Sequence, residues 1–195
     1  MGTIVLQMMV TVDGLAGGPD GEMDWISRDI ELHQAHQTIL HQSQAAILGI
    51  EACAGMAEFW TKTEHNEDAG SFFMEFAREF NDKRKIAYSH KEREINWRNT
   101  EVHIVKDDEA IKEDINLLKK EINGQMVFYG GIRLAQKLLK LRLIDEIYLD
   151  VCPVILGKGK PLFPELNQRI ELELLQAAGY KTGAALLHYK VVNKT

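Results

Sequence analysis

A short apolar strand that runs directly into two adjacent glycines constrains the fold of this chain more than any other feature. Residues 127–136 read Val-Phe-Tyr-Gly-Gly-Ile-Arg-Leu-Ala-Gln, so a helical pattern begins immediately after Gly130 and Gly131. Glycine carries no Cβ, so a ligand can approach the backbone closely and unusual dihedral angles cost little. The N–H groups in the first turn of the new helix favour a phosphate. The pattern is typical of a nucleotide-binding edge in an open α/β sheet, but a plain tight turn produces it too.

The double glycine does not belong to either of the common nucleotide-binding fingerprints. Arg133 follows the pair, and no glycine stands at the third position of a G-x-G-x-x-G motif. No Gly-Lys-Ser or Gly-Lys-Thr follows, so the segment is not a P-loop. The sequence therefore gives no support for a classical dinucleotide fingerprint or an NTPase site.

Length and composition indicate a globular protein. A chain of 195 residues can build a full core, and we expect one domain over residues 1–195. The net charge of −6 argues against a general nucleic-acid binder. Cys53 and Cys152 show neither metal nor disulfide spacing and fit thiols in a reducing cytosol. The N-terminus lacks a signal-peptide pattern, and no apolar run would cross a bilayer, so we expect a cytoplasmic location without a membrane partner.

Strand-like and helix-like segments alternate along the chain and end in a run of strands. This order predicts an α/β fold: a mostly parallel twisted sheet with helices on both faces and an antiparallel C-terminal hairpin. Strands are expected at residues 3–12, 45–49, 85–89, 102–105, 125–129 and 144–155, and the hairpin at 170–178 and 184–192. Helices are expected at about residues 28–43, 51–58, 72–80, 107–121 and 132–141, with loops at 17–21, 61–70 and 157–161.

Short segments spread over nearly the whole chain also carry a family likeness. They are residues 10–14, 18–21, 24–25, 47–49, 88–89, 127–131 and 143–163, in this order. The set resembles the dihydrofolate-reductase-like family, specifically the proteins akin to the C-terminal reductase domain of bacterial riboflavin biosynthesis. The resemblance implies a dihydrofolate-reductase-like fold, NADPH as the hydride donor, and a homodimer.

The resemblance also implies the cofactor site, segment by segment. The glycine pair and the helix start match the family's pyrophosphate site, and the end of the second strand matches another cofactor contact. The turn after the third strand matches the place that usually meets the adenosine 2′-phosphate. The implied cofactor-binding residues are Leu48, Gly49, Ser89, His90, Lys91, Gly130, Gly131, Ile132, Arg133 and Leu134. For His90 and Lys91, a solvated turn is an equally good interpretation.

The substrate and catalytic residues follow from the first loop. Asp13 and the residues after it match the loop that flanks nicotinamide and substrate, and Asp29 lies nearest the carboxylate that binds the pterin in dihydrofolate reductases. Asp13 is alternatively a turn residue before Gly14, and Asp29 a charge at a helix start. The implied substrate-binding residues are Leu15, Ala16, Asp24 and Trp25, and the candidate catalytic residues are Asp13 and Asp29.

Two positions depart from the family pattern. Ile50 stands where the family usually has an arginine that binds phosphate, and Leu15 stands where an aromatic residue is common. An aliphatic side chain cannot replace the planar fork of donors of a guanidinium. Loss of one charge-assisted hydrogen bond costs on the order of 1.5–3 kcal/mol, roughly tenfold or more in affinity.

Three functions therefore stay open, the last of them a structural oligomer subunit without a ligand. The first is an NADPH-dependent reductase of a small heterocyclic substrate, pterin-like or pyrimidine-like. The second is a non-catalytic nucleotide-binding or regulatory relative that kept the fold. His33 and His36 share a helix face but have no third ligand at useful spacing, so we expect no metal site. The phenylalanines at 72, 73, 76 and 80 recur at helical spacing and predict a core-facing stripe.

Overall fold

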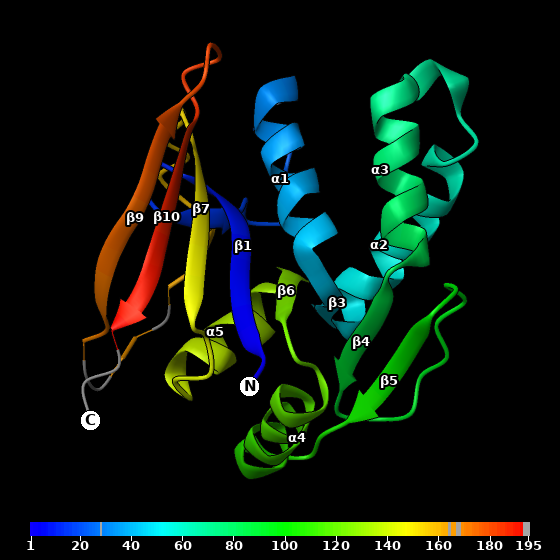
Figure 1. Ribbon diagram of the computed structural model, residues 1–195. Coiled ribbons are helices and arrows are strands. Elements are labelled where there is room, and N and C mark those ends of the chain that lie inside the picture. Colours follow the sequence, from blue (N-terminus) through cyan, green and yellow to red (C-terminus); the bar gives the residue numbers. More distant parts are fainter. Residues whose placement is uncertain (28, 164, 167–168, 193–195) are drawn as a thin grey trace.

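The computed structural model describes residues 1–27, 29–163, 165–166 and 169–192, and its centre is one eight-stranded sheet (Figure 1). The strand order is β5-β4-β3-β6-β1-β7-β10-β9. The first six strands in this order run parallel, and β10 pairs antiparallel with both β7 and β9. The strands are β1 (Thr3–Thr11), β3 (Ser43–Gly49), β4 (Arg84–Ser89), β5 (Thr100–Ile104), β6 (Gln125–Gly130), β7 (Glu146–Cys152), β9 (Glu171–Gly179) and β10 (Ala185–Val192).

Helices cover both faces of the sheet because successive residues of each strand point to opposite sides. Helices α1, α2 and α3 pack on one face, and α4 and α5 pack on the other. The prediction of a mostly parallel sheet with helices on both faces and an antiparallel C-terminal hairpin is confirmed. The helices are α1 (Ile30–Gln42), α2 (Ile50–Thr63), α3 (Ser71–Asp82), α4 (Asp108–Glu121) and α5 (Ile132–Lys140), with a short 3₁₀ turn η1 (Glu67–Ala69).

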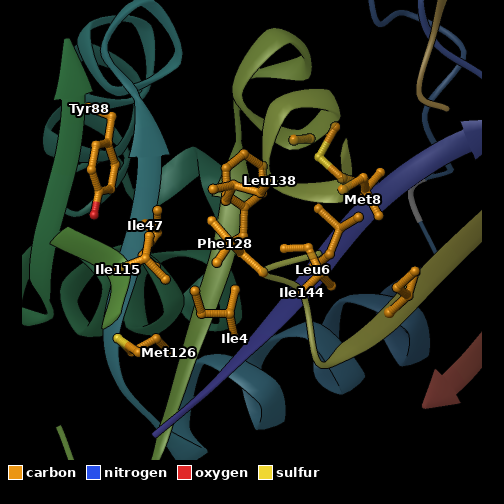
Figure 2. Packing of buried hydrophobic residues seen from close by; sticks show 14 of the residues in the cluster. Ile4, Leu6, Met8, Ile47, Tyr88, Ile115, Met126, Phe128, Leu138 and Ile144 are labelled. Atoms are coloured by element: carbon orange, nitrogen blue, oxygen red, sulfur yellow. The ribbon is translucent and has the colours of Figure 1, made fainter. Parts of the chain in front are cut away.

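The two cores divide the strands by alternate residues. On β6, Phe128 faces α4 and α5, whereas Val127 faces α1, α2 and α3. Figure 2 shows the first core, in which Phe128 and Leu138 of α5 lie close to Leu6 of β1. Burying a large apolar side chain stabilises the fold by about 1.5–3 kcal/mol. The expected phenylalanine stripe lies on α3, where Phe76 and Phe80 are buried and Phe72 and Phe73 are half-buried.

Several element bounds differ from the sequence-based expectations. Helix α2 continues to Thr63, where the polar composition predicted a loop, and the Thr63 hydroxyl in its last turn donates to the carbonyl of Phe59 at 2.8 Å. The long apolar segment at 144–155 forms a strand only over Glu146–Cys152, before Pro153. The predicted loops at 17–21 and 157–161 contribute a two-stranded sheet of β2 (Leu15–Gly17) and β8 (Lys160–Pro161). The expected helix start at Arg28 lies outside the described residues.

The connections create a switch in direction at the centre of the sheet. From β3 the chain moves outward through α2 to β4, whereas from β6 it moves through α5, past β1, to β7. Helices α2 and α5 therefore leave adjacent strands on opposite faces of the sheet. In open α/β sheets, ligands bind in the crevice at the carboxyl ends of such strands. The topology alone therefore points to the ends of β3 and β6 as a ligand site.

The antiparallel hairpin forms the outer edge of the sheet (Figure 1). Strand β9 is exposed over most of its length, including Leu172, Leu174 and Leu175. Exposed edge strands with apolar side chains are templates for pairing with another chain. No helix among the described residues has the length and hydropathy needed to cross a membrane.

Candidate functional site

The carboxyl ends of β3 and β6 meet backbone to backbone at glycines. A Cβ on Gly131 would lie 3.0 Å from both the Cα and the N of Gly49, and Gly131 has a φ of +107°. A Cβ on Gly130 would lie 2.9 Å from the Cε of Met56 on α2. Residues with a side chain rarely adopt such a φ, and the neighbouring atoms leave no room for a Cβ here. Glycine is therefore needed at Gly131 for both its conformation and its contact.

This contact brings the N-termini of α2 and α5 together, and no side chain caps either of them. Their N-cap residues are Gly49 and Gly131. In contrast, the carboxylates of Asp29 and Asp107 cap α1 and α4. The first-turn N–H groups of a helix have no intrahelical partner and carry partial positive charge. Two such helix ends at one point of the sheet edge suit a pyrophosphate, each helix contributing about 0.3–1 kcal/mol to anion binding.

The residues predicted around the glycines lie in these same elements. Ile132, Arg133 and Leu134 form the first turn of α5, and the Arg133 side chain is exposed. Leu48 is fully buried, so its side chain belongs to the core and its backbone to the strand end. Ile50 starts α2 and packs against the core beneath the helix. The first position of α2 therefore presents no cation.

A cation does come near the start of α2 from another segment. The guanidinium of Arg93 forms an ion pair with Glu51, which lies in the first turn of α2. The pair leaves little net charge at this end of the helix. Arg93 also borders a surface hollow of about 400 Å³ between α2 and residues 93–96, whose lining contains none of the predicted site residues.

The predicted 2′-phosphate turn follows β4 and is held by its own hydrogen bonds. The Ser89 hydroxyl, which is buried, donates to the carbonyl of Lys91 at 2.6 Å. The ring Nδ1 of His90 lies 2.8 Å from the carbonyl of Val105 and donates to it. The side chains of His90 and Lys91 are exposed. The turn therefore presents two basic side chains to solvent at the edge of the sheet that carries the glycines.

The Asp13 carboxylate holds the first loop against the segment after β7. It accepts hydrogen bonds from the Thr11 hydroxyl at 2.5 Å and from the amides of Gly157 at 2.8 Å and Leu156 at 3.3 Å. These bonds, the one from Thr11 foremost, hold the pKa of Asp13 below its ordinary value. This carboxylate is therefore ionised at neutral pH and already has three donors.

The predicted substrate-binding residues lie in the loops that follow. Leu15 and Ala16 form part of β2, where Ala16 is buried and Leu15 half-buried. Asp24 is exposed, and Trp25 is half-buried with its indole N–H donating to the carbonyl of Glu22 at 3.2 Å. Leu15 and Ala16 lie close to the carboxyl end of β1. Asp24 forms no hydrogen bond or ion pair with other residues in the described part of the chain.

Asp29 is the N-cap of α1. Its carboxylate accepts from the amides of Glu31 at 2.9 Å and Leu32 at 3.3 Å, and from the Thr182 hydroxyl at 3.2 Å. Burial opposes ionisation, but the bonds from Leu32, Glu31 and Thr182 outweigh it and lower the pKa of Asp29. These contacts fit the interpretation of Asp29 as a charge at a helix start. Its catalytic role stays a prediction.

One buried polar pair was not predicted. His36 of α1 and Asp150 of β7 are almost fully buried, with 2.8 Å between Nε2 and Oδ2. The signal in the sequence was Asp150, a carboxylate inside an otherwise apolar strand. The partner could not be identified because it lies on a distant helix. Among the described residues, no group of three metal-ligating side chains comes together.

Comparisons with known proteins agree with this architecture. A profile of the RibD C-terminal domain matches residues 2–186. The uncharacterized protein YyaP of Bacillus subtilis is 31% identical over 186 residues, which cover 95% of this chain and 93% of YyaP. Two solved structures are similar to this chain in fold alone.

A riboflavin biosynthesis protein of Shewanella sp. PV-4 has a similar structure, with a TM-score of 0.73 and 18% identity over 98% of this chain and 99% of that one. Dihydrofolate reductase from Enterococcus faecalis, complexed with NADP(H) and RAB-propyl, gives a TM-score of 0.61 and 14% identity over 98% of this chain and 97% of that one. The dihydrofolate-reductase-like fold predicted from the sequence is thereby confirmed. With a profile match over most of its length, the chain belongs to the RibD C-terminal domain family.

Proposed function

We propose that this chain is a cytoplasmic NADPH-dependent reductase of a small heterocyclic substrate, pterin-like or pyrimidine-like. The observation that carries the proposal is the contact of Gly49 with Gly131, which joins two uncapped helix N-termini at the switch point of the sheet. Membership of the RibD C-terminal domain family supports it. A protein of the same fold, the Enterococcus reductase, was solved with NADP(H).

The glycine cradle fits the cofactor because it offers backbone N–H groups and leaves no side chain in the way. When bound, NADPH supplies a hydride from its nicotinamide ring. Exposed Arg133 adds a positive charge beside the α5 terminus, and His90 and Lys91 face solvent at the turn proposed for the 2′-phosphate. The proposed cofactor-binding residues are Leu48, Gly49, Ser89, His90, Lys91, Gly130, Gly131, Ile132, Arg133 and Leu134.

The proposed substrate site lies between the first loop and the start of α1. Leu15 and Ala16 would form its apolar floor, and Trp25 and Asp24 its outer wall. Asp13 and Asp29 flank this site, and their hydrogen bonds hold the loop and the helix start in place. Because both carboxylates have lowered pKa values, we assign them to organisation of the site in the ionised form.

A specific observation favours a second function, a non-catalytic nucleotide-binding or regulatory relative. Ile50 packs into the core at the position where the family pattern has an arginine, and the nearby Arg93 is paired with Glu51. The phosphate site therefore depends on helix ends and backbone groups. Such a protein would bind a nucleotide weakly and would not catalyse reduction of a substrate.

The experiment that separates the two functions is NADPH oxidation by the purified protein with probe acceptors. Dihydrofolate and 5-amino-6-(5-phosphoribosylamino)uracil represent the pterin and pyrimidine classes. The reductase proposal predicts acceptor-dependent loss of NADPH absorbance with at least one class. Saturable NADPH binding without turnover of either acceptor supports the non-catalytic relative.

A further inference from the structure

The buried pair of Asp150 and His36 is poorly explained by stability. Asp150 is 0% exposed and His36 is 1% exposed. Although Nε2 and Oδ2 are 2.8 Å apart, neither carboxylate oxygen receives a well-directed hydrogen bond from the described residues. A buried charge costs several kcal/mol unless excellent geometry and further hydrogen bonds compensate for it. Such a pair calls for a role beyond holding α1 to the sheet.

A second imidazole extends this pair toward the surface. The rings of His36 and His33 meet edge to face, with 5.4 Å between centroids and 87° between planes. His33 is half-buried, and its ring also contacts Phe73 of α3, with centroids 5.2 Å apart. The three side chains of Asp150, His36 and His33 form a row that runs from the sheet to the first turn of α1.

The outer end of this row lies at the edge of the sheet that carries the glycines. The Ser27 amide donates to Sγ of Cys152, the last residue of β7, and the Thr182 hydroxyl donates to Asp29 at the start of α1. These contacts tie the segment that leads into α1 to the carboxyl end of β7 and to the turn between β9 and β10. Only β1 separates β7 from β6. With strands about 4.8 Å apart, β7 lies roughly 10 Å from the strand that ends at Gly130.

Reduction by hydride transfer needs a proton as well as a hydride, and neither Asp13 nor Asp29 suits that task. Asp13 and Asp29 are held ionised by their hydrogen bonds. His33 differs from both. Burial, followed by the neighbouring His36, lowers the pKa of His33, while a hydrogen bond to the Ser27 backbone and the charges of Asp150 and Asp29 oppose the shift. Because the ordinary pKa of histidine, about 6.5, lies much nearer physiological pH than that of a carboxylate, the ring still exchanges a proton there after a downward shift.

We propose that His33 donates the proton to the substrate during reduction, and that His36 and Asp150 are the positioning residues that orient its ring. This inference rests on the proposed reductase function. In the balanced step, a hydride adds to the carbon of a C=N or C=O bond and the proton of His33 adds to its nitrogen or oxygen. The acceptor gains two electrons, NADPH becomes NADP⁺, and neutral His33 regains a proton from solvent.

The charges around His33 define the expected pH dependence. Asp29 and His36 belong to its own helix and Asp150 to the sheet beneath, while Phe73 of α3 brings no charge. Because the protonated ring is the donor, kcat should rise as the pH falls through the pKa of His33. Loss of the negative charge in Asp150→Asn should lower that pKa, since Asp150 favours the protonated ring.

The test compares His33→Gln with wild type by kcat, KM and NADPH affinity, using NADPH and the acceptor class that wild type turns over. We expect kcat to fall about 100-fold, within the range for loss of a general acid, with an unchanged NADPH Kd and a flat pH profile. His41→Gln is the matched control, because His41 lies on the same helix with a side chain 80% exposed and should keep wild-type kinetics.

A second readout uses histidine NMR and does not need a substrate. In wild type, the His33 resonances should titrate with pH, and in Asp150→Asn their midpoint should move to lower pH. A wild-type kcat and pH profile in His33→Gln would overturn the proposal while leaving the reductase function intact. Failure of wild type to bind NADPH would overturn both, so the two failures are distinguishable.

Discussion

Gly49 and Gly131 lie so close that a Cβ on Gly131 would be 3.0 Å from the Cα of Gly49. The contact joins the ends of two neighbouring parallel strands whose chains then leave on opposite faces of the sheet. It therefore places two helix N-termini at one point, where their partial positive charges add. The proposed cofactor site depends on this one contact.

Gly131→Ala should weaken both the fold and NADPH binding. The positive φ alone costs about 1–2 kcal/mol for a residue with a Cβ, and the close backbone contact adds to that cost by pushing the strand ends apart. We expect a lower urea midpoint and at least a tenfold higher NADPH Kd.

Gly70→Ala is the matched control for that variant. Gly70 is also an N-cap glycine with positive φ, but its Cβ would meet nothing within 4 Å. It should lose stability and keep NADPH affinity. Equal NADPH affinity in Gly131→Ala and Gly70→Ala would show that the contact between Gly49 and Gly131 does not contribute to cofactor binding.

Ile50→Arg should tighten NADPH binding. A guanidinium at the start of α2 adds a charge-assisted bond to phosphate, worth about 1.5–3 kcal/mol, or roughly tenfold or more in Kd. Ile50→Met extends the side chain without charge and serves as the control. An unchanged Kd in Ile50→Arg, measured by calorimetry at fixed salt, would show that no phosphate lies near this helix end.

Much of the fold was predictable because apolar periodicity is a local property. The continuous apolar run in β6 predicts a strand buried on both faces, and the spacing of Ile111 and Ile115 in α4 predicts which side of the helix is buried. The strand order was not predictable in this way, because the place of β6 between β3 and β1 depends on packing between distant segments. The extra turn of α2 was missed because its residues are polar, although Thr63 at its end is buried in the fold.

The candidate site was also predictable from the sequence only in part. The double glycine was visible because strand, turn and helix follow one another in the sequence. The contact between Gly49 and Gly131 was not, and neither was the pairing of His36 with Asp150, since each joins residues far apart in the chain. The hydrogen bonds that occupy Asp13 and Asp29 also come from remote residues such as Gly157 and Thr182.

Lys85 should make stability depend on pH in the alkaline range. Its Nζ is buried and donates to the carbonyls of Phe80, Asn81 and Lys83, and burial lowers its pKa to about 8. Between about pH 8 and 10.5 the unfolded chain keeps a proton that the folded chain has released, so unfolding free energy rises with pH, by up to about 3 kcal/mol.

The measurement for Lys85 is urea unfolding across this pH range in wild type and Lys85→Met. The unfolding free energy of wild type minus that of Lys85→Met should increase with pH, because only wild type carries the amine whose pKa is lowered by folding. Lys62→Met, at an exposed position of α2, should follow wild type. Parallel curves for wild type and Lys85→Met would contradict the assignment.

The exposed strand β9 is where we expect the homodimer contact. Leu174 is 54% exposed on this edge strand, so Leu174→Glu should put charges into any contact built there. Light scattering should give a dimer for wild type and a monomer for Leu174→Glu. Leu117→Glu, at a position of α4 that is 63% exposed, should remain dimeric. A dimer that survives Leu174→Glu would require a different interface.

The central claim is that the paired helix ends at Gly49 and Gly131 bind NADPH, and titration of the purified protein by tryptophan fluorescence quenching tests it most directly. We expect saturable NADPH binding in the low micromolar range, with weaker binding of NADH because that molecule lacks the 2′-phosphate. Absence of quenching up to millimolar NADPH would contradict the account.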